Sequence, residues 1–267
     1  MPKTILITGA GSGFAEAAAV GLARKGHHVI ATAQISPQVF ALREKAKQLD
    51  LHNLRVEKLD LFDAYDVANA QAMDVDVLWN NAGYGESGPV SEIPVELVRH
   101  NFEVNVFRPL AFTQGFIKRW VAEKKKAKIV FTSSVGGLFT PAGWGPYVST
   151  KHALESMAEA MQQELAAFDI KVQTINPGAY LTGYNETMAD TAFRWLDDTK
   201  NFTKRDQLRK TFDALLGQPE GHLDPKDMVD LMIDVVPAET GKFRNVLHQF
   251  VEDLIKKTQA DAWNTKI

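Results

Sequence analysis

The chain has 267 residues, and its shares of 45% apolar and 24% charged residues are those of an ordinary folded protein rather than a disordered one. The net charge of −3, together with the lack of a basic stretch interleaved with aromatic residues, argues against a nucleic-acid partner. Without cysteine there is no disulfide, thiolate metal site or Cys nucleophile, and the seven scattered histidines show no HExxH spacing, so we expect no metal.

The sequence also lacks the patterns of a membrane protein. No uninterrupted apolar stretch approaches the roughly 18 residues that span a bilayer. The N-terminus enters a strand pattern at Lys3, without the long apolar run and cleavage site of a secretory signal. We therefore expect a cytoplasmic protein without a membrane partner.

The first elements form a strand, turn, helix and strand. An apolar strand at 5–7 ends in the turn Thr8-Gly9-Ala10-Gly11-Ser12-Gly13, which is followed by a helix at 14–25 and a second strand at 28–32. The N–H groups of a helix N-terminus attract a phosphate, and glycine lets the phosphate approach closely. The unit therefore suits a dinucleotide, although tight turns between strands and helices use glycine for other reasons too.

The alternation of strands and helices continues along the chain. Further helices are predicted near 37–49, 64–72, 94–126, 147–168, 204–216 and 225–236, with one more at the C-terminus. Further strands are predicted at 54–59, 75–79, 128–132, 171–176 and 243–247. This pattern predicts an α/β fold, a single-domain, Rossmann-like doubly wound parallel sheet with helices on both faces, over residues 1–267. The aromatic-rich segment at about 180–222 is expected to form a substrate-binding lid.

Tyr147 and Lys151 stand four residues apart at the start of a predicted helix, so their side chains share one face. Ser134 arrives from the end of the preceding strand. A phenol beside an ammonium and a hydroxyl can move one proton to or from a substrate oxygen. Taken alone, such a Tyr and Lys are more often a packed ring and a surface amine.

With these residues assembled, the sequence resembles the short-chain dehydrogenase/reductase family, in its common short form, across essentially the whole chain. The resemblance rests on the turn at 8–13, Asn-Asn-Ala-Gly at 80–83, Ser134 and the Tyr-x-x-x-Lys motif, in that order. It implies an NAD(P)-dependent oxidoreductase that interconverts a carbonyl and a secondary alcohol by hydride transfer. The implied catalytic tetrad is Asn105, Ser134, Tyr147 and Lys151.

The resemblance gives each member of this tetrad a role. Tyr147 would be the general acid or base, with a pKa lowered by the positive charge of Lys151 and of oxidised nicotinamide. Ser134 would hydrogen-bond the substrate oxygen. Asn105 would hold a water in a proton relay to Lys151.

The resemblance also implies a set of cofactor contacts. These residues are Thr8, Gly9, Gly11, Ser12, Gly13, Phe14, Ala33, Gln34, Asp60, Leu61, Asn81, Ala82, Gly83, Tyr147, Lys151, Pro177, Gly178 and Thr182. Asp60 would serve equally well as the cap of the helix that follows it. Ala15 replaces the usual third glycine, a change that the G-or-A form of the fingerprint accommodates.

The end of the second strand bears on the choice of cofactor. An acidic side chain there would bind the ribose hydroxyls of NAD and repel the 2′-phosphate of NADP. The sequence has Ala33 and Gln34 instead, and it also lacks the Arg that NADP users commonly carry next. Since Thr32, Gln34 and Ser36 can donate hydrogen bonds to a phosphate, we favour NADP, with NAD as the alternative.

A small-molecule substrate is expected to bind among the loops that surround Tyr147. The predicted substrate-pocket residues are Tyr84, Phe139, Trp144, Tyr180 and Tyr184. Such an apolar lining suits a hydrophobic ketone, and Glu86 is the one obvious charge nearby.

Two other functions were weighed against a reductase. One is a non-catalytic dinucleotide-sensing or scaffold protein of the same fold, and the other is a redox-free lyase such as a halohydrin dehalogenase. Lys151 and the intact glycine turn argue against the lyase, and the presence of both Tyr147 and Lys151 argues against the sensor. The resemblance further implies a homodimer or homotetramer.

Overall fold

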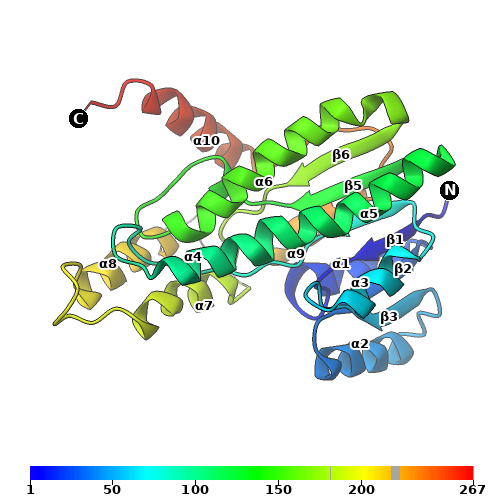
Figure 1. Ribbon diagram of the computed structural model, residues 1–267, viewed down its shortest axis with the longest axis horizontal. Coiled ribbons are helices and arrows are strands. Elements are labelled where there is room, and N and C mark those ends of the chain that lie inside the picture. The colour runs from blue at the N-terminus through cyan, green and yellow to red at the C-terminus, as the bar shows by residue number, and fades with distance from the viewer. Residues whose placement is uncertain (181, 218–222, 267) are drawn as a thin grey trace.

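One parallel sheet organises the computed structural model, which describes residues 1–180, 182–217 and 223–266 (Figure 1). Within these residues the sheet has seven strands in the order β3-β2-β1-β4-β5-β6-β7. The strands are β1 (Thr4–Ile7), β2 (His28–Ala33), β3 (Leu54–Lys58), β4 (Val77–Asn80), β5 (Ala127–Thr132), β6 (Ile170–Ile175) and β7 (Arg244–Asn245). The chain order reverses between β1 and β4, so the crevice of a doubly wound sheet opens beyond their carboxyl ends.

Helices cover both faces of this sheet, as the sequence predicted. The α-helices are α1 (Gly13–Arg24), α2 (Ser36–Gln48), α3 (Ala64–Gln71), α4 (Val95–Phe102), α5 (Arg108–Glu123), α6 (Gly145–Glu164), α7 (Tyr184–Thr191), α8 (Arg205–Leu216), α9 (Pro225–Val235) and α10 (Gln249–Ala262). The prediction of a Rossmann-like α/β fold is confirmed.

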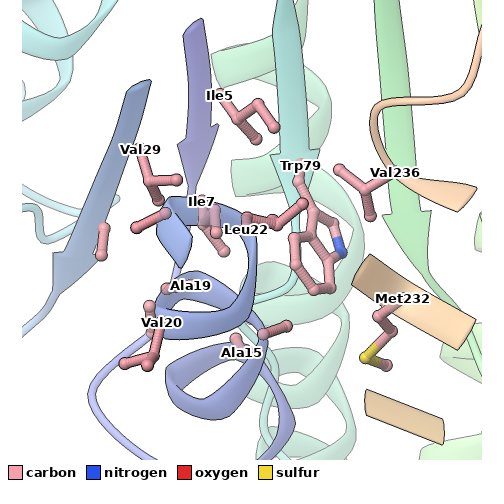
Figure 2. Close-up of a cluster of buried hydrophobic side chains, with 14 of the residues drawn as sticks. Ile5, Ile7, Ala15, Ala19, Val20, Leu22, Val29, Trp79, Met232 and Val236 are labelled. Atoms are coloured by element: carbon pink, nitrogen blue, oxygen red, sulfur yellow. The ribbon is translucent and has the colours of Figure 1, made fainter. Parts of the chain in front are cut away.

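Successive side chains of each strand pack into two separate hydrophobic cores, one on each face of the sheet. Ile5 and Ile7 of β1 pack with α1, α2 and α9, whereas Leu6 packs on the other face with α5 and α6. Figure 2 shows the first of these cores, in which Leu22 of α1 and Met232 of α9 meet Trp79 of β4. A strand that is buried on both faces has a continuous apolar sequence, and this is why these strands could be predicted from the sequence.

The helices predicted from about 94 to 126 are observed as α4 and α5. A π-helical turn, η1 (Glu103–Phe107), lies between them. The strand predicted at 243–247 shortens to β7, which pairs with β6 through only two residues. The helix predicted at 147–168 starts two residues earlier and ends in a 3-10 turn, η3 (Ala166–Phe168).

The segment expected to act as a lid carries its own helices. It contains α7, the 3-10 turn η4 (Ala192–Arg194) and α8, while residues 181 and 218–222 of the predicted span lie outside the described residues. A third apolar cluster joins Met188 of α7 and Phe212 of α8 to Trp144 and Val148 at the start of α6. The lid helices are thus anchored beside Tyr147, and their role as a lid remains a prediction.

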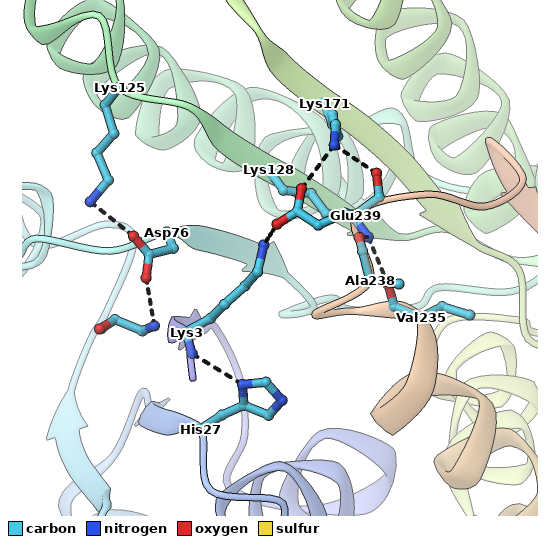
Figure 3. A network of polar contacts seen from close by, with 10 residues as sticks. Lys3, His27, Asp76, Lys125, Lys128, Lys171, Val235, Ala238 and Glu239 are labelled. Atoms are coloured by element: carbon cyan, nitrogen blue, oxygen red, sulfur yellow. Dashed lines mark hydrogen bonds and ion pairs between the residues drawn. The ribbon is translucent and has the colours of Figure 1, made fainter. Parts of the chain in front are cut away.

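A polar network lies at the amino ends of the strands, opposite their carboxyl ends (Figure 3). The buried amine of Lys128 on β5 donates to the carbonyls of Val235 (2.6 Å) and Ala238 (2.8 Å) at the end of α9. Lys3 and Lys171 both pair with Glu239. Burial lowers the pKa of Lys128 to about 7, and the charges of Lys3 and Lys171 add to this effect. The two hydrogen bonds from this buried amine connect the C-terminal end of α9 to the sheet.

Among the residues that the structure describes, no helix combines the length and the apolar character needed to cross a bilayer. The same residues contain no group of three His, Asp or Glu side chains placed to hold a metal ion.

Candidate active site

A cavity of about 660 Å³ lies at the carboxyl ends of the strands. Its walls come from the segments that follow each of the strands β1 to β6, and from α4, η1 and α7. Elements far apart in the sequence therefore meet around one space. The position is the one at which open α/β sheets bind their ligands.

The glycine turn after β1 forms one end of the cavity. Gly9 has a φ of +68°, and a Cβ added there would lie 2.7 Å from the Cα of Ala82. Gly13 has a φ of +64° and faces open space, because a Cβ there would meet nothing within 4 Å. The N-cap residue of α1, Ser12, makes no side-chain cap hydrogen bond, so its hydroxyl does not occupy the N–H groups of the first turn. These features fit the pyrophosphate of a dinucleotide.

Thr8 and Asn81 hold the turn against the end of β4. The Thr8 hydroxyl oxygen accepts from the backbone N–H of Asn81 (2.9 Å) and of Ala82 (3.0 Å). The Asn81 amide donates to the carbonyls of Thr8 and Gly9, both at 3.2 Å, and its oxygen accepts from Thr132 at 3.0 Å. The two motifs that the sequence placed 70 residues apart thus form one rigid wall.

The end of β2 carries no acidic side chain on the cavity wall. Gln34 and Gln38 line it, whereas Ala33 is buried beneath. Asp60 and Leu61 also line the cavity. The Asp60 carboxylate accepts from the N–H of Phe62 (2.9 Å), and it is Asp63 that caps α3, so Asp60 is free of the capping role weighed from the sequence.

Ser134, Tyr147 and Lys151 meet at the centre of the cavity. Ser134 follows β5, and its hydroxyl accepts from Gly136 N–H (3.0 Å) and donates to the Pro177 carbonyl (3.3 Å). The Tyr147 hydroxyl is in hydrogen-bond contact with the side chains of Ser134 and Tyr184. The Lys151 amine donates to the Thr132 carbonyl (2.9 Å) and lies 5.6 Å from the centre of the Tyr147 ring.

Burial dominates the electrostatics of this group. It raises the pKa of Tyr147 to about 12, against hydrogen bonds from Tyr184 and Ser134 that favour the phenolate. It lowers the pKa of Lys151 to about 8, against the favourable charge of Glu155. The lowering of the Tyr147 pKa expected from Lys151 is not observed in this structure, where burial raises the pKa and Tyr184 and Ser134 oppose the rise. At neutral pH the phenol holds its proton and Lys151 is mostly charged.

Asn105 lies on the π-helical turn η1 and is buried behind the cavity wall. Its side-chain oxygen accepts from Tyr84 N–H (2.8 Å), and its amide donates to the Tyr84 carbonyl (2.7 Å) and to Thr150 (3.0 Å). The Asn105 side chain thus holds the backbone of Tyr84 in position. π-Helical turns are frequent at functional sites, and the water relay stays a prediction.

The structure brings most of the remaining predicted residues to the cavity and leaves two outside it. Tyr84, Tyr180 and Tyr184 line the cavity, as do the predicted cofactor residues Gly11, Phe14, Gly83, Pro177, Gly178 and Thr182. Trp144 is buried against Phe212, with ring centroids 5.0 Å apart, and Phe139 is half-buried in the loop before it. Neither Phe139 nor Trp144 lines the cavity among the described residues.

Several lining residues were missed by the sequence reasoning. Among them are Gln38, Phe62, His100, Val104, Asn185 and Thr187. His100 and Val104 lie one helical turn apart, just before Asn105, so helical spacing carried a signal for them. Gln38 comes from inside α2, and only the folded structure turns it toward the glycine loop: a Cβ on Gly11 would lie 2.7 Å from its side chain.

Comparison with known proteins identifies the family. The family model described as short chain dehydrogenase matches residues 3–192. An uncharacterized oxidoreductase, YusZ of Bacillus subtilis, is 31% identical over 243 residues, which are 89% of this chain and 85% of that protein. An NADPH-dependent 3-dehydrocapnine reductase of Ornithobacterium rhinotracheale is 31% identical over 66% of this chain and 65% of its own.

A solved structure has the same fold. A short chain dehydrogenase/reductase of Burkholderia phymatum, in complex with NAD, superposes with a TM-score of 0.80 at 23% identity, over 100% of this chain and 96% of that one. The chain belongs to the short-chain dehydrogenase/reductase family. It is an NAD(P)-dependent oxidoreductase that acts on small molecules.

Proposed function

We propose that this enzyme reduces a hydrophobic ketone to a secondary alcohol with NADPH, and that Tyr147 supplies the proton. The observation that carries the proposal is the convergence of the Ser134 and Tyr147 hydroxyls beside Lys151 at the floor of the cavity. A carbonyl oxygen placed there would be held by two donors, which polarise the carbonyl and position it for reduction.

The protein residues divide the proton chemistry among them. When bound, the nicotinamide supplies a hydride to the carbonyl carbon. Tyr147 gives its proton to the oxygen, and a pKa of about 12 keeps that proton available at neutral pH. The Tyr147 phenolate that remains is stabilised by the nearby Lys151 ammonium and by the donors Ser134 and Tyr184.

The preference for NADPH follows from the end of β2. The wall there presents the amides of Gln34 and Gln38 and no carboxylate to repel a 2′-phosphate. The Ornithobacterium relative is named as NADPH-dependent, which supports the same choice. The NAD complex of the Burkholderia protein keeps NAD as the alternative.

The preference for a hydrophobic substrate follows from the walls around Tyr147. Tyr84, from the segment after β4, and Tyr184 and Met188 of α7 line this part of the cavity, and Met188 belongs to the third apolar cluster together with Tyr147. Apolar walls with a few convergent polar groups favour a hydrophobic ketone over a sugar or a phosphate ester.

Titration of the purified protein with NADPH and NADH, followed by a ketone panel, tests the proposal. We expect tighter binding of NADPH and turnover of hydrophobic ketones that is lost in Tyr147→Phe while cofactor binding persists. Higher catalytic efficiency with NADH would overturn the cofactor preference. Turnover confined to polyhydroxylated or highly charged carbonyls would overturn the substrate class. Cofactor binding without any Tyr147-dependent turnover would favour the sensing function.

We also propose that the enzyme is a homodimer or homotetramer. The support is the family, whose members are commonly oligomeric, together with the length of α5 and α6. Sedimentation of a single monomeric species at micromolar concentration would refute this.

A further inference from the structure

Glu86 is a buried carboxylate without a counter-ion at the substrate end of the cavity. Only 4% of the residue is exposed. Its one hydrogen bond to a described residue comes from the hydroxyl of Tyr84, and no Lys, Arg or His in the described part of the chain forms an ion pair with it. A buried charge without a partner is costly, so its retention calls for an explanation.

Tyr84 connects this carboxylate to the cavity. The Tyr84 side chain lines the wall, while Glu86 lies behind it. Burial and the hydrogen bond to Glu86 raise the pKa of Tyr84 to about 12, so the phenol keeps its proton. Since that proton points to Glu86, the oxygen of Tyr84 can only accept hydrogen bonds from the cavity side.

The position of Tyr84 is rigid. Both backbone polar groups of Tyr84 are held by the Asn105 side chain, and its ring packs edge-on against His100 with centroids 5.3 Å apart. Ser87, three residues after Tyr84 and one after Glu86, donates its backbone N–H to the Thr191 hydroxyl of α7 (2.9 Å). A fixed acceptor backed by a negative charge is a preorganised recognition group.

The surroundings offer this charge no protein partner. Arg194 lies on the lid, and its charge opposes the rise in the pKa of Tyr84, but Arg194 is exposed and does not pair with Glu86. Lys151 is committed to the Thr132 carbonyl and to Tyr147. A cationic group on a ligand would supply the complementary charge that no described ion pair provides.

We infer that Tyr84 and Glu86 form a subsite for a protonated amine carried by the substrate near its carbonyl group, so that the substrate class is an amino ketone with an apolar chain. The amine would donate to the Tyr84 oxygen and be attracted by the Glu86 carboxylate, while the carbonyl oxygen meets Ser134 and Tyr147. This inference rests on the proposed function, because it names the substrate of that same site.

The test compares three long-chain ketones that differ at one position. The first carries a free amine beside the carbonyl, the second has the amine N-acetylated, and the third lacks the nitrogen. With NADPH, we expect the wild-type enzyme to favour the free amine in kcat/KM by at least about tenfold, which is the scale of a hydrogen bond to a charged group. Glu86→Gln keeps the size of the side chain and removes its charge.

The readout is the ratio of kcat/KM for the amine to that for the nitrogen-free ketone. We expect this ratio to collapse toward one in Glu86→Gln and to fall in Tyr84→Phe, which guards against a single variant that fails to fold. A wild-type enzyme that reduces all three ketones equally, or a ratio unchanged in both variants, overturns the inference. Absence of Tyr147-dependent turnover on every ketone is a different result, because it overturns the proposed function itself.

Discussion

Replacement of Tyr184 by Phe should change the pH at which Tyr147 exchanges its proton. Tyr184 is the first residue of α7, and its ring lies edge-on to that of Tyr147 with centroids 6.1 Å apart. Its hydroxyl bonds to Tyr147 and favours the charged form of Tyr147. Loss of one hydrogen bond to a charged oxygen costs about 1.5–3 kcal/mol, which corresponds to about one to two pKa units.

The sign of the effect follows from which form of Tyr147 reacts. Alcohol oxidation needs the phenolate, so its rate rises with pH through the pKa of Tyr147. Removing a donor to the phenolate raises that pKa, and the rising limb of kcat should therefore move to higher pH by about one unit, with about tenfold less activity at a pH below the limb. Ketone reduction needs the phenol, so its loss at alkaline pH should move upward by the same amount.

The assay is the pH profile of kcat in both directions, with a matched control. Tyr84→Phe removes a hydroxyl from the same cavity, but one that bonds to Glu86 rather than to Tyr147, so it should leave the profile for a nitrogen-free substrate in place. If Tyr184→Phe lowers kcat without moving either limb, Tyr184 is only a wall of the cavity and the reasoning is wrong.

Three further changes test other parts of the molecule. Gly9→Ala should lower the free energy of unfolding by about 1–2 kcal/mol and weaken NADPH binding, because φ is +68° and the new methyl group meets Ala82; denaturant unfolding and cofactor titration measure both. Gln34→Asp should weaken NADPH binding at least about tenfold while sparing NADH, because a carboxylate would face the 2′-phosphate; an equal loss for both cofactors would contradict this. Lys128 has a pKa lowered to about 7 in the folded protein, against the ordinary 10.5, so its charge destabilises the fold below pH 7 and the penalty is relieved as pH rises from 7 toward 10.5. The free energy of unfolding of the wild type should therefore increase by at most about 2 kcal/mol between pH 7.5 and 9, and this increase should be absent in Lys128→Met. Urea unfolding at each pH measures both.

The parallel sheet and its glycine turn were accessible from the sequence because their causes are local. Ile5, Leu6 and Ile7 are buried on both faces, so the strand reads as an apolar run, and Gly9 is required by a single turn with positive φ. The positions of Tyr147 and Lys151 follow from the spacing of one helix. Such features need no knowledge of distant parts of the chain.

The substrate side of the site was less accessible because its causes are not local. Trp144 is an aromatic residue close to Tyr147, the proposed catalytic residue, and the sequence placed Trp144 in the pocket. Whether its ring faces the cavity or the core depends on where Phe212, 68 residues later, packs. The π-helical turn at Asn105 also has no pattern of its own. It inserts a residue into a helix that is otherwise continuous in sequence, and only the contact with Tyr84 gives it a reason.

That contact joins the two halves of the site. Asn105 belongs to the predicted catalytic tetrad, yet its side chain forms hydrogen bonds with the backbone of Tyr84. The hydroxyl of Tyr84 in turn donates to Glu86. Ser87, the next residue, is fastened to α7, the helix that also supplies Tyr184 to the reacting phenol. A ligand that engages Tyr84 therefore acts on the same segment that positions Tyr184 above Tyr147. Binding energy gained at the amine of the substrate can thus be used to orient the groups that move the proton, which is how contacts with non-reacting groups raise kcat rather than only lower KM.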